Sequence, residues 1–270
     1  MSETHSNLLV RPRAEGQTLV DITPQSAGWR YIGFTVYRLS AGETVALQSV
    51  PREQCIVVLG GIVTVHSGED LWREIGGRKS VFEDLPPYAV YLPGGRAAGM
   101  MAHTTAEVAV ASTPGGGDWI PPRLIEPAAM RRFERGRGTN LRYVCDILPE
   151  TEPAANLLLV EVRTPASHSS SYPPHKHDRD ALPEESQLEE IYYHRIDPPC
   201  GFGFQRIYTD DRSIDEAIAV ENHDTVLVPR GYHPVVMPHG YQGYYLNVMA
   251  GPNRLWRIKN DPVHEWLLGR

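Results

Sequence analysis

Long apolar runs, paired cysteines and a basic surplus are all missing from this sequence. No apolar stretch approaches the roughly 20 residues that a membrane-spanning helix requires, and the N-terminus carries neither the basic start nor the apolar segment of a signal peptide. The three cysteines are widely spaced and form no CxxC pair, which argues against a disulfide framework and against a zinc–thiolate site. These absences favour a cytoplasmic protein with reduced thiols and no membrane partner.

A concentrated basic face is also lacking. Acidic residues outnumber basic ones by 33 to 26, and the net charge is −7, which argues against a nucleic-acid partner. The densest basic stretch is interrupted by Phe133, Glu134 and glycines, so we interpret it as a solvated linker or a subunit surface. It contains Arg131, Arg132, Arg135, Arg137 and Arg142.

Helical periodicity is nearly absent. Instead, 24 glycines and 23 prolines separate short β-rich runs, among them residues 55–65, 88–92, 191–196, 225–228 and 244–249. Many short strands with regular turn signals predict an all-β sandwich or barrel. Residues 214–220 are expected to form one or two helical turns within a loop.

Two weakly similar halves are visible. Glu53 and Glu190 each head an apolar strand, and each half later has a strand that ends in proline and a glycine turn, at residues 91–95 and 228–231. An internal duplication of one barrel explains this pattern. We expect a first barrel at residues 1–125, a linker at 126–140 and a second barrel at 141–270.

Histidine is unevenly distributed, since seven of the eleven lie between His168 and His239. His175 and His177 are two residues apart, so an extended strand presents both on one face. Glu190 begins the next strand, and His233 follows a glycine turn. Three imidazoles and one carboxylate suit a divalent transition metal and can leave coordination positions open. We predict one metal ion per chain on these four residues, with Zn, Mn or Fe as the best candidates, and a first barrel without metal.

Several alternatives accompany this ligand set. Glu189 competes with Glu190, which we favour because Tyr192 and His194 then share its face of the strand. His194 is either a fifth ligand or a buried support for the others. His239 lies at a turn near the predicted metal, and structural and functional interpretations of it are equally open.

The order of these residues resembles the cupin pattern: HxH, then a glutamate heading a strand, then a Pro-x-Gly turn that delivers a histidine. Two departures stand out. Residues 178–188 form an insertion, and His233 follows Gly231 by two positions rather than three. The first half resembles a cupin that has kept Glu53 but has no HxH. The resemblance therefore implies a bicupin, with two antiparallel jelly-roll-like β-barrels and few helices, in which the first barrel serves structure and assembly.

Nearly the whole chain is similar to the 5-deoxy-glucuronate isomerase family of bacterial myo-inositol catabolism, a relative of the 5-keto-4-deoxyuronate isomerases. The runs that carry this resemblance are residues 26–34, 173–178, 189–195, 201–211, 228–235 and 244–252. The resemblance implies a metal-dependent isomerisation of 5-deoxy-D-glucuronate to 5-dehydro-2-deoxy-D-gluconate. It also implies a small sugar-acid substrate and a homo-oligomer.

Such an isomerisation needs a proton acceptor near the carbon acid and a cationic clamp for the substrate carboxylate. His239, His194 and Tyr192 are the candidate catalytic residues, and no pattern singles out one of them. Arg206 and Arg230 are the candidate carboxylate ligands because they lie nearest the metal-binding segments. A metal-dependent dioxygenase and a non-catalytic sugar-binding cupin remain as alternative functions.

Overall fold

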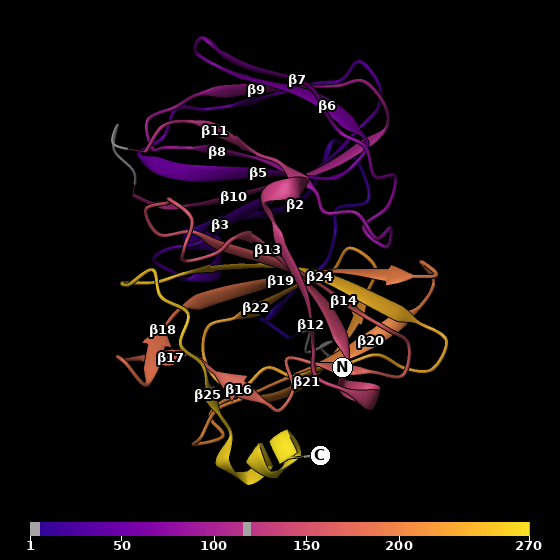
Figure 1. The fold of residues 1–270 in the computed structure, drawn as a ribbon, viewed down its shortest axis with the longest axis vertical. Coiled ribbons are helices and arrows are strands. Elements are labelled where there is room, and N and C mark those ends of the chain that lie inside the picture. The colour runs from indigo at the N-terminus through magenta and orange to yellow at the C-terminus, as the bar shows by residue number, and fades with distance from the viewer. Residues whose placement is uncertain (1–5, 116–119, 270) are drawn as a thin grey trace, which may run out of the picture. The chain divides into compact units, whose positions relative to one another are not determined.

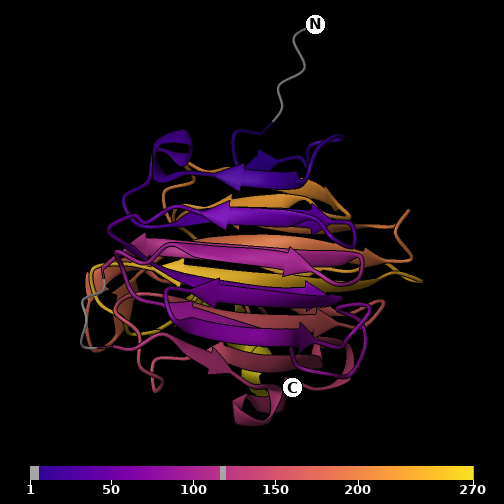
Figure 2. The same ribbon diagram turned by 90° about the horizontal axis from the view of Figure 1, so that it is seen from above.

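The computed structural model describes residues 6–115 and 120–269, and its regular structure is almost entirely β-strand (Figures 1 and 2). The first five residues, on which the prediction of no signal peptide depends, lie outside this part of the chain. In the part that is described, no helix has the length and apolarity needed to span a membrane. The predicted all-β fold is confirmed.

The chain divides into two compact units whose boundaries differ from the expected ones. One unit consists of Arg13–Arg131 and Cys145–Leu159, and the other of Met1–Pro12, Arg132–Val144 and Val160–Arg270. Backbone pairing explains part of this exchange, because Leu9 of the N-terminal segment pairs with Val226 in the second unit. The expected linker at 126–140 is also structured, and it contains a strand and two short 3-10 helices.

The first unit consists of a six-stranded sheet of order β11-β8-β5-β10-β3-β2 and a four-stranded sheet of order β4-β9-β6-β7. Its core contains apolar residues of both sheets, such as Ile56, Val65 and Val90. The elements are β2 (Thr18–Ile22), α1 (Pro24–Ala27), β3 (Gly33–Leu39), β4 (Thr44–Leu47), β5 (Arg52–Gly60), β6 (Ile62–Ser67), β7 (Asp70–Gly76), β8 (Tyr88–Leu92), β9 (Ala98–Ala102), β10 (Ala106–Pro114), β11 (Arg123–Ile125) and the 3-10 helix η1 (Pro127–Ala129).

The second unit includes strands of a seven-stranded sheet of order β1-β22-β19-β24-β14-β13-β12 and a four-stranded sheet of order β15-β23-β20-β21. Two short pairs, β16-β25 and β17-β18, complete it. The elements are β1 (Leu9–Val10), β12 (Arg131–Arg135), η2 (Gly138–Asn140), β13 (Arg142–Leu148), β14 (Leu158–Thr164), β15 (Ser169–Ser170), β16 (His175–Lys176), β17 (Asp178–Ala181), β18 (Glu185–Gln187), β19 (Glu189–Asp197), β20 (Phe202–Tyr208), β21 (Asp215–Glu221), β22 (Thr225–Val228), β23 (Val235–Val236), β24 (Gln242–Ala250), β25 (Lys259–Asn260) and η3 (Pro262–Gly269).

The two units repeat one strand order. In the larger sheets β5 lies between β8 and β10, as β19 lies between β22 and β24, and the smaller sheets repeat β4-β9-β6-β7 as β15-β23-β20-β21. Glu53 and Glu190 are each the second residue of the corresponding strand. This correspondence supports the internal duplication predicted from the sequence.

Three local features differ from or refine the expected elements. The run 55–65 is split into β5 and β6 at Gly61, which has a φ of 88° and approaches the backbone of Thr105 too closely for a side chain. The helical turns expected at 214–220 were wrong, because this segment forms β21, in which Ile218 and Val220 are buried and their neighbours point outward. The insertion at 178–188 contains the short hairpin β17-β18.

Candidate metal centre

The first two predicted ligands flank a short strand. His175 and Lys176 form β16, which pairs with β25 at the C-terminal end of the chain, and His177 follows directly. Alternation sends the middle residue to the other face, where the Lys176 ammonium contacts the carboxylates of Asp178 and Asp210 at 3.1 and 2.6 Å. Both histidines are buried. The HxH segment is therefore held from both sides.

The other two ligands come from a central strand and a turn. Glu190 lies on β19 opposite Val228 of β22 and Met249 of β24, and its side chain is 1% exposed, whereas Glu189 is only half-buried. His233 follows Gly231, whose φ of 93° allows the turn, and it is fully buried. This burial supports the choice of Glu190 over Glu189.

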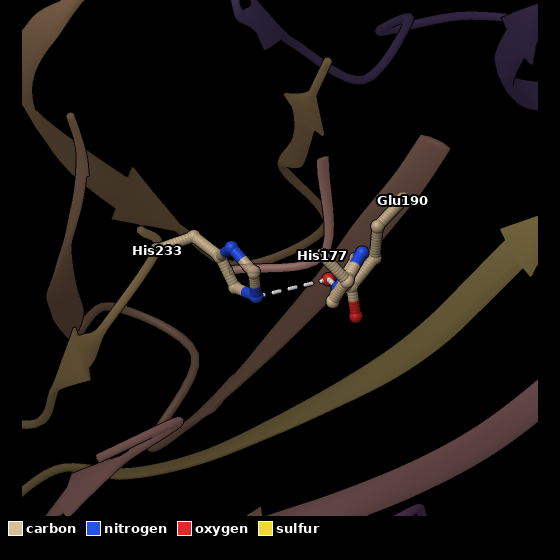
Figure 3. A group of neighbouring side chains, drawn as sticks. All are labelled: His177, Glu190 and His233. Carbon is tan, nitrogen blue, oxygen red and sulfur yellow. Dashed lines mark hydrogen bonds and ion pairs between the residues drawn. The ribbon is translucent and has the colours of Figure 1, made fainter. Parts of the chain in front are cut away.

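The side chains of His177 and His233 meet at one oxygen of Glu190 (Figure 3). The Nε2 atoms of His177 and His233 lie 3.0 and 3.1 Å from Glu190 Oε2, and one ligand atom from each residue lies within 4.8 Å of the others. In the described part of the chain, this is the one group of histidine, cysteine or acidic residues with such spacing.

The orientation of the two rings suits a cation bound between them. His233 Nδ1 lies 2.8 Å from the carbonyl oxygen of Gly231, and His177 Nδ1 lies 3.3 Å from that of Leu188. A carbonyl only accepts, so each Nδ1 donates, and an Nε2 that gives up its proton to make room for a metal directs its lone pair toward the carboxylate. Consistent with this, His233 Nε2 makes no hydrogen bond of good geometry with any described residue. A divalent ion would satisfy these acceptors.

His175 lies beside this group and not within it. Its ring centroid is 4.9 Å from that of His233, nearly at right angles, and 6.4 Å from that of His177. Burial, followed by the charges of His233 and His177, holds the pKa of His175 well below its ordinary value. The ring therefore stays neutral, which is the form that binds metal.

The charge of Glu190 is also favourable. Burial alone would raise its pKa, but the neighbouring imidazoles of His233 and His177 outweigh this effect and lower the pKa to about 2. The carboxylate is thus ionised at neutral pH, as a metal ligand must be.

Two of the predicted catalytic residues lie close to this centre. The Tyr192 ring centroid is 5.7 Å from that of His233, and its hydroxyl is 2.8 Å from Ser171 Oγ. His194 is stacked on Tyr192 at 5.9 Å, and its Nε2 is 2.8 Å from Gln205 Oε1. Burial lowers the pKa of His194 to about 4. Both side chains face the barrel interior.

The remaining predicted site residues lie elsewhere. His239 is exposed, and its Nδ1 lies 3.4 Å from Ser167 Oγ. Arg206 points outward from β20 and binds Asp215, with Nε and Nη2 at 2.9 and 2.7 Å from Oδ1. Arg230 is exposed and lies 3.0 Å from Ser213 Oγ. The structure does not bring these three residues to the metal centre.

Sequence reasoning missed a cavity that opens beside His175. It has a volume of about 710 Å³, and its lining includes Arg135, Arg142, Tyr172, His175, Asn260 and Leu268. Two arginines interpreted as linker or subunit surface thus line the same cavity as a predicted metal ligand. One signal was available, because Arg142 shares its face of β13 with the buried Val144, while Tyr143 between them is exposed.

Known proteins match this chain closely. The model of the KduI/IolB family matches residues 8–267. The 5-deoxy-glucuronate isomerases of Geobacillus thermodenitrificans and Listeria monocytogenes are 52% and 49% identical over 95% of the chain, which covers 93% and 95% of their lengths. An IolB-like protein of Salmonella typhimurium LT2 is 48% identical and superposes with a TM-score of 0.96 over 97% of this chain and all of that one.

More distant structures share the fold alone. Oxalate decarboxylase of Lactobacillus farciminis has a TM-score of 0.68 at 11% identity, over 99% of this chain and 91% of that one. The family match spans both β units and includes all four predicted metal ligands. The chain therefore belongs to the KduI/IolB family.

Proposed function

We propose that this protein is a metal-dependent aldose–ketose isomerase that converts 5-deoxy-D-glucuronate to 5-dehydro-2-deoxy-D-gluconate. The observation that carries the proposal is the convergence of His177 and His233 on the buried carboxylate of Glu190. It occurs in a chain that is 52% identical to a 5-deoxy-glucuronate isomerase over almost its whole length. The same donor set and similarity together favour an isomerase over a simple sugar-binding protein.

The reaction moves a hydrogen between two neighbouring carbons and leaves the oxidation state of the whole molecule unchanged. His175, His177, Glu190 and His233 would hold one divalent ion, for which Zn, Mn and Fe are suited by this mixture of imidazole and carboxylate. When bound, such an ion supplies a Lewis acid that polarises the substrate carbonyl and the adjacent hydroxyl. The side chains of the protein then position the sugar chain and donate or accept protons at its oxygens and carbons.

Tyr192 is suited to donate a hydrogen bond to a substrate oxygen. Burial, together with the charge of Glu190, raises the pKa of this phenol well above its ordinary value, so it stays protonated at neutral pH. Its ring packs beside His233, and its hydroxyl contacts Ser171. We assign His194, neutral and engaged with Gln205, to holding the Tyr192 ring in place.

An anaerobic assay with 5-deoxy-D-glucuronate, with metal content measured on the same preparation, tests the proposal. We expect conversion without oxygen by protein that contains one metal ion per chain and loses activity on chelation. A requirement for oxygen would indicate a dioxygenase, and binding without turnover would indicate a sugar-binding protein. The homo-oligomer and the cytoplasmic location stay predictions, which light scattering and cell fractionation would test.

A further inference from the structure

Arg142 is a buried cation without a carboxylate partner among the described residues. The residue is only 5% exposed. Its Nη1 contacts the carbonyl oxygen and Oδ1 of Asn140, both at 3.0 Å, and both acceptors are neutral. Burying a charge costs several kcal/mol unless an opposite charge compensates for it. Such an arrangement is typical of a site that receives an anion.

Arg142 lines a cavity that extends to His175, the predicted ligand beside the His177–Glu190–His233 group. Arg142 and His175 line the same space of about 710 Å³. Burial lowers the pKa of Arg142, and Tyr245 and Tyr192 lie close enough to oppose this effect. The like charge of Arg135, an exposed residue of the same cavity, adds to the positive field there.

Asn140 fixes the orientation of the guanidinium. Besides accepting from Arg142, it donates from Nδ2 to the carbonyl oxygen of Tyr172 at 3.2 Å, and Tyr172 also lines the cavity. One side of the planar guanidinium is thereby occupied. Its remaining nitrogens can present two parallel N–H groups to a carboxylate, a geometry that lysine cannot reproduce.

We propose that Arg142 binds the substrate's carboxylate, and that it makes the enzyme selective for sugar acids over neutral sugars. The proposal rests on the isomerase function proposed above, because the substrate then carries its reacting carbonyl at one end and a carboxylate at the other. The carbonyl end lies at the histidine cluster and the carboxylate end at Arg142. Arg135 strengthens the attraction without direct contact, since it lies at the exposed part of the cavity.

Kinetics on two substrates test this assignment. They are 5-deoxy-D-glucuronate and 5-deoxy-D-glucose, in which a hydroxymethyl group replaces the carboxylate. We expect Arg142→Met to lower kcat/KM for the acid on the order of 100-fold, as for other lost partners of buried ion pairs. For the neutral sugar we expect less than about a threefold change, so that the preference of the wild type for the acid is lost. Arg212→Met, a change at a surface arginine of the same unit, is the matched control and should leave both values unchanged.

Two further measurements separate a binding role from a structural one. The metal content of Arg142→Met should match that of the wild type, and its melting temperature should be no lower, because an uncompensated buried charge is removed. Should this variant fail to fold, Arg142→Lys takes its place, and it should raise KM for the acid while leaving kcat within a few-fold. Equal losses on both substrates, or an unchanged preference for the acid, would overturn the assignment.

A binding experiment keeps this inference distinct from the proposed function. Calorimetry with D-glucuronate and the metal-loaded proteins applies even if the wild type turns over neither substrate, an outcome that would contradict the isomerase proposal alone. Loss of D-glucuronate binding in Arg142→Met, with retention in Arg212→Met, supports the carboxylate site. Equal binding by all three proteins refutes it.

Discussion

At the scale of single residues, the buried carboxylate of Glu190 governs the metal centre, because the Nε2 atoms of both neighbouring imidazoles approach one of its oxygens. Each ring is fixed by an Nδ1 contact with a backbone carbonyl, so neither can turn away without breaking a hydrogen bond. Loss of a single ligand therefore leaves the remaining acceptors facing one another in a dry interior.

We expect His233→Ala to lower metal affinity by more than about 100-fold and to abolish activity, since outer partners of metal ligands already contribute 10- to 100-fold. His239→Ala should keep its metal, because this side chain is exposed and contacts Ser167. Elemental analysis of both purified variants, with circular dichroism to verify folding, provides the measurement. A metal-free His239→Ala beside a metal-loaded His233→Ala would show that the fourth ligand has been misplaced.

His194 should make stability sensitive to acid. Burial lowers its pKa to about 4, from an ordinary value of 6.5, so the folded protein holds fewer protons than the unfolded chain between these values. Stability is then fully present above pH 6.5 and is lost as pH falls through 4, by about 3 kcal/mol from this group. Urea unfolding of metal-free wild type and His194→Asn over this range should show that the variant lacks this part of the slope. Parallel pH profiles for the two proteins would contradict the expectation.

The candidate ligands could be predicted from local sequence because their positions depend on local rules. The two-residue spacing of His175 and His177, and the alternation that separates Glu190 from Glu189, are properties of extended chain. Arg142 was not predicted because its burial depends on segments far away, such as Asn260 and Leu268 across the cavity. A run rich in arginine, taken alone, suggests surface.

At the scale of elements, the turn before His233 is the most restrictive feature of the site. Gly231 has a φ of 93°, a Cβ there would lie 2.5 Å from the carbonyl oxygen of Tyr208, and its own carbonyl accepts from His233. Gly240 has a similar φ of 87° and open space around the position of a Cβ. Substitution of Gly240 therefore tests backbone strain alone, whereas substitution of Gly231 combines this strain with a steric clash.

We expect Gly231→Ala to lower the free energy of unfolding by about 3 kcal/mol and to reduce metal affinity, because strain and a clash act together. Gly240→Ala should cost about 1 kcal/mol from strain alone and should keep the metal. Thermal unfolding and metal titration of both variants measure these effects. Equal metal affinities would show that the turn does not position His233.

Elements that depend on pairing were harder to predict than elements with a strong pattern. Residues 214–220 suggested helical turns, yet β21 pairs along its whole length with β20, from Phe202 opposite Glu221 to Tyr208 opposite Asp215. A seven-residue amphipathic segment fits either structure, and the neighbouring strand decides between them.

At the scale of the whole molecule, the corresponding strands of the two units have diverged in chemistry. Glu53, the counterpart of Glu190, accepts hydrogen bonds from the backbone N–H groups of Ala155, Asn156 and Leu157 at 2.6–2.7 Å and from the Tyr91 hydroxyl at 2.6 Å. The Glu53 carboxylate is thus bound mainly by backbone N–H groups, whereas the Glu190 carboxylate of the second unit contacts two imidazoles. The sequence revealed the duplication, and it could not reveal that residues 145–159 return to the first unit to supply these donors.

The C-terminal segment should be needed for metal binding, because β25 pairs with β16 and Asp261 accepts from the Tyr208 hydroxyl at 2.8 Å. We expect truncation after Ile258 to reduce metal affinity at least about 10-fold, by analogy with other supports of metal ligands. Truncation after Pro262 keeps β25 and Asp261 and should bind metal normally. Competition with a chromogenic chelator measures the metal affinity of both proteins. A normal affinity in the protein truncated after Ile258 would contradict the expectation.

This pairing has a consequence for biosynthesis. All four candidate ligands are translated by residue 233, whereas the partner strand of the HxH segment follows only at Lys259–Asn260. Units generally fold from the N-terminus onward during synthesis, and β16 has no partner until β25 has also emerged. Nascent chains that already contain every ligand but not yet β25 would therefore not hold the ion tightly.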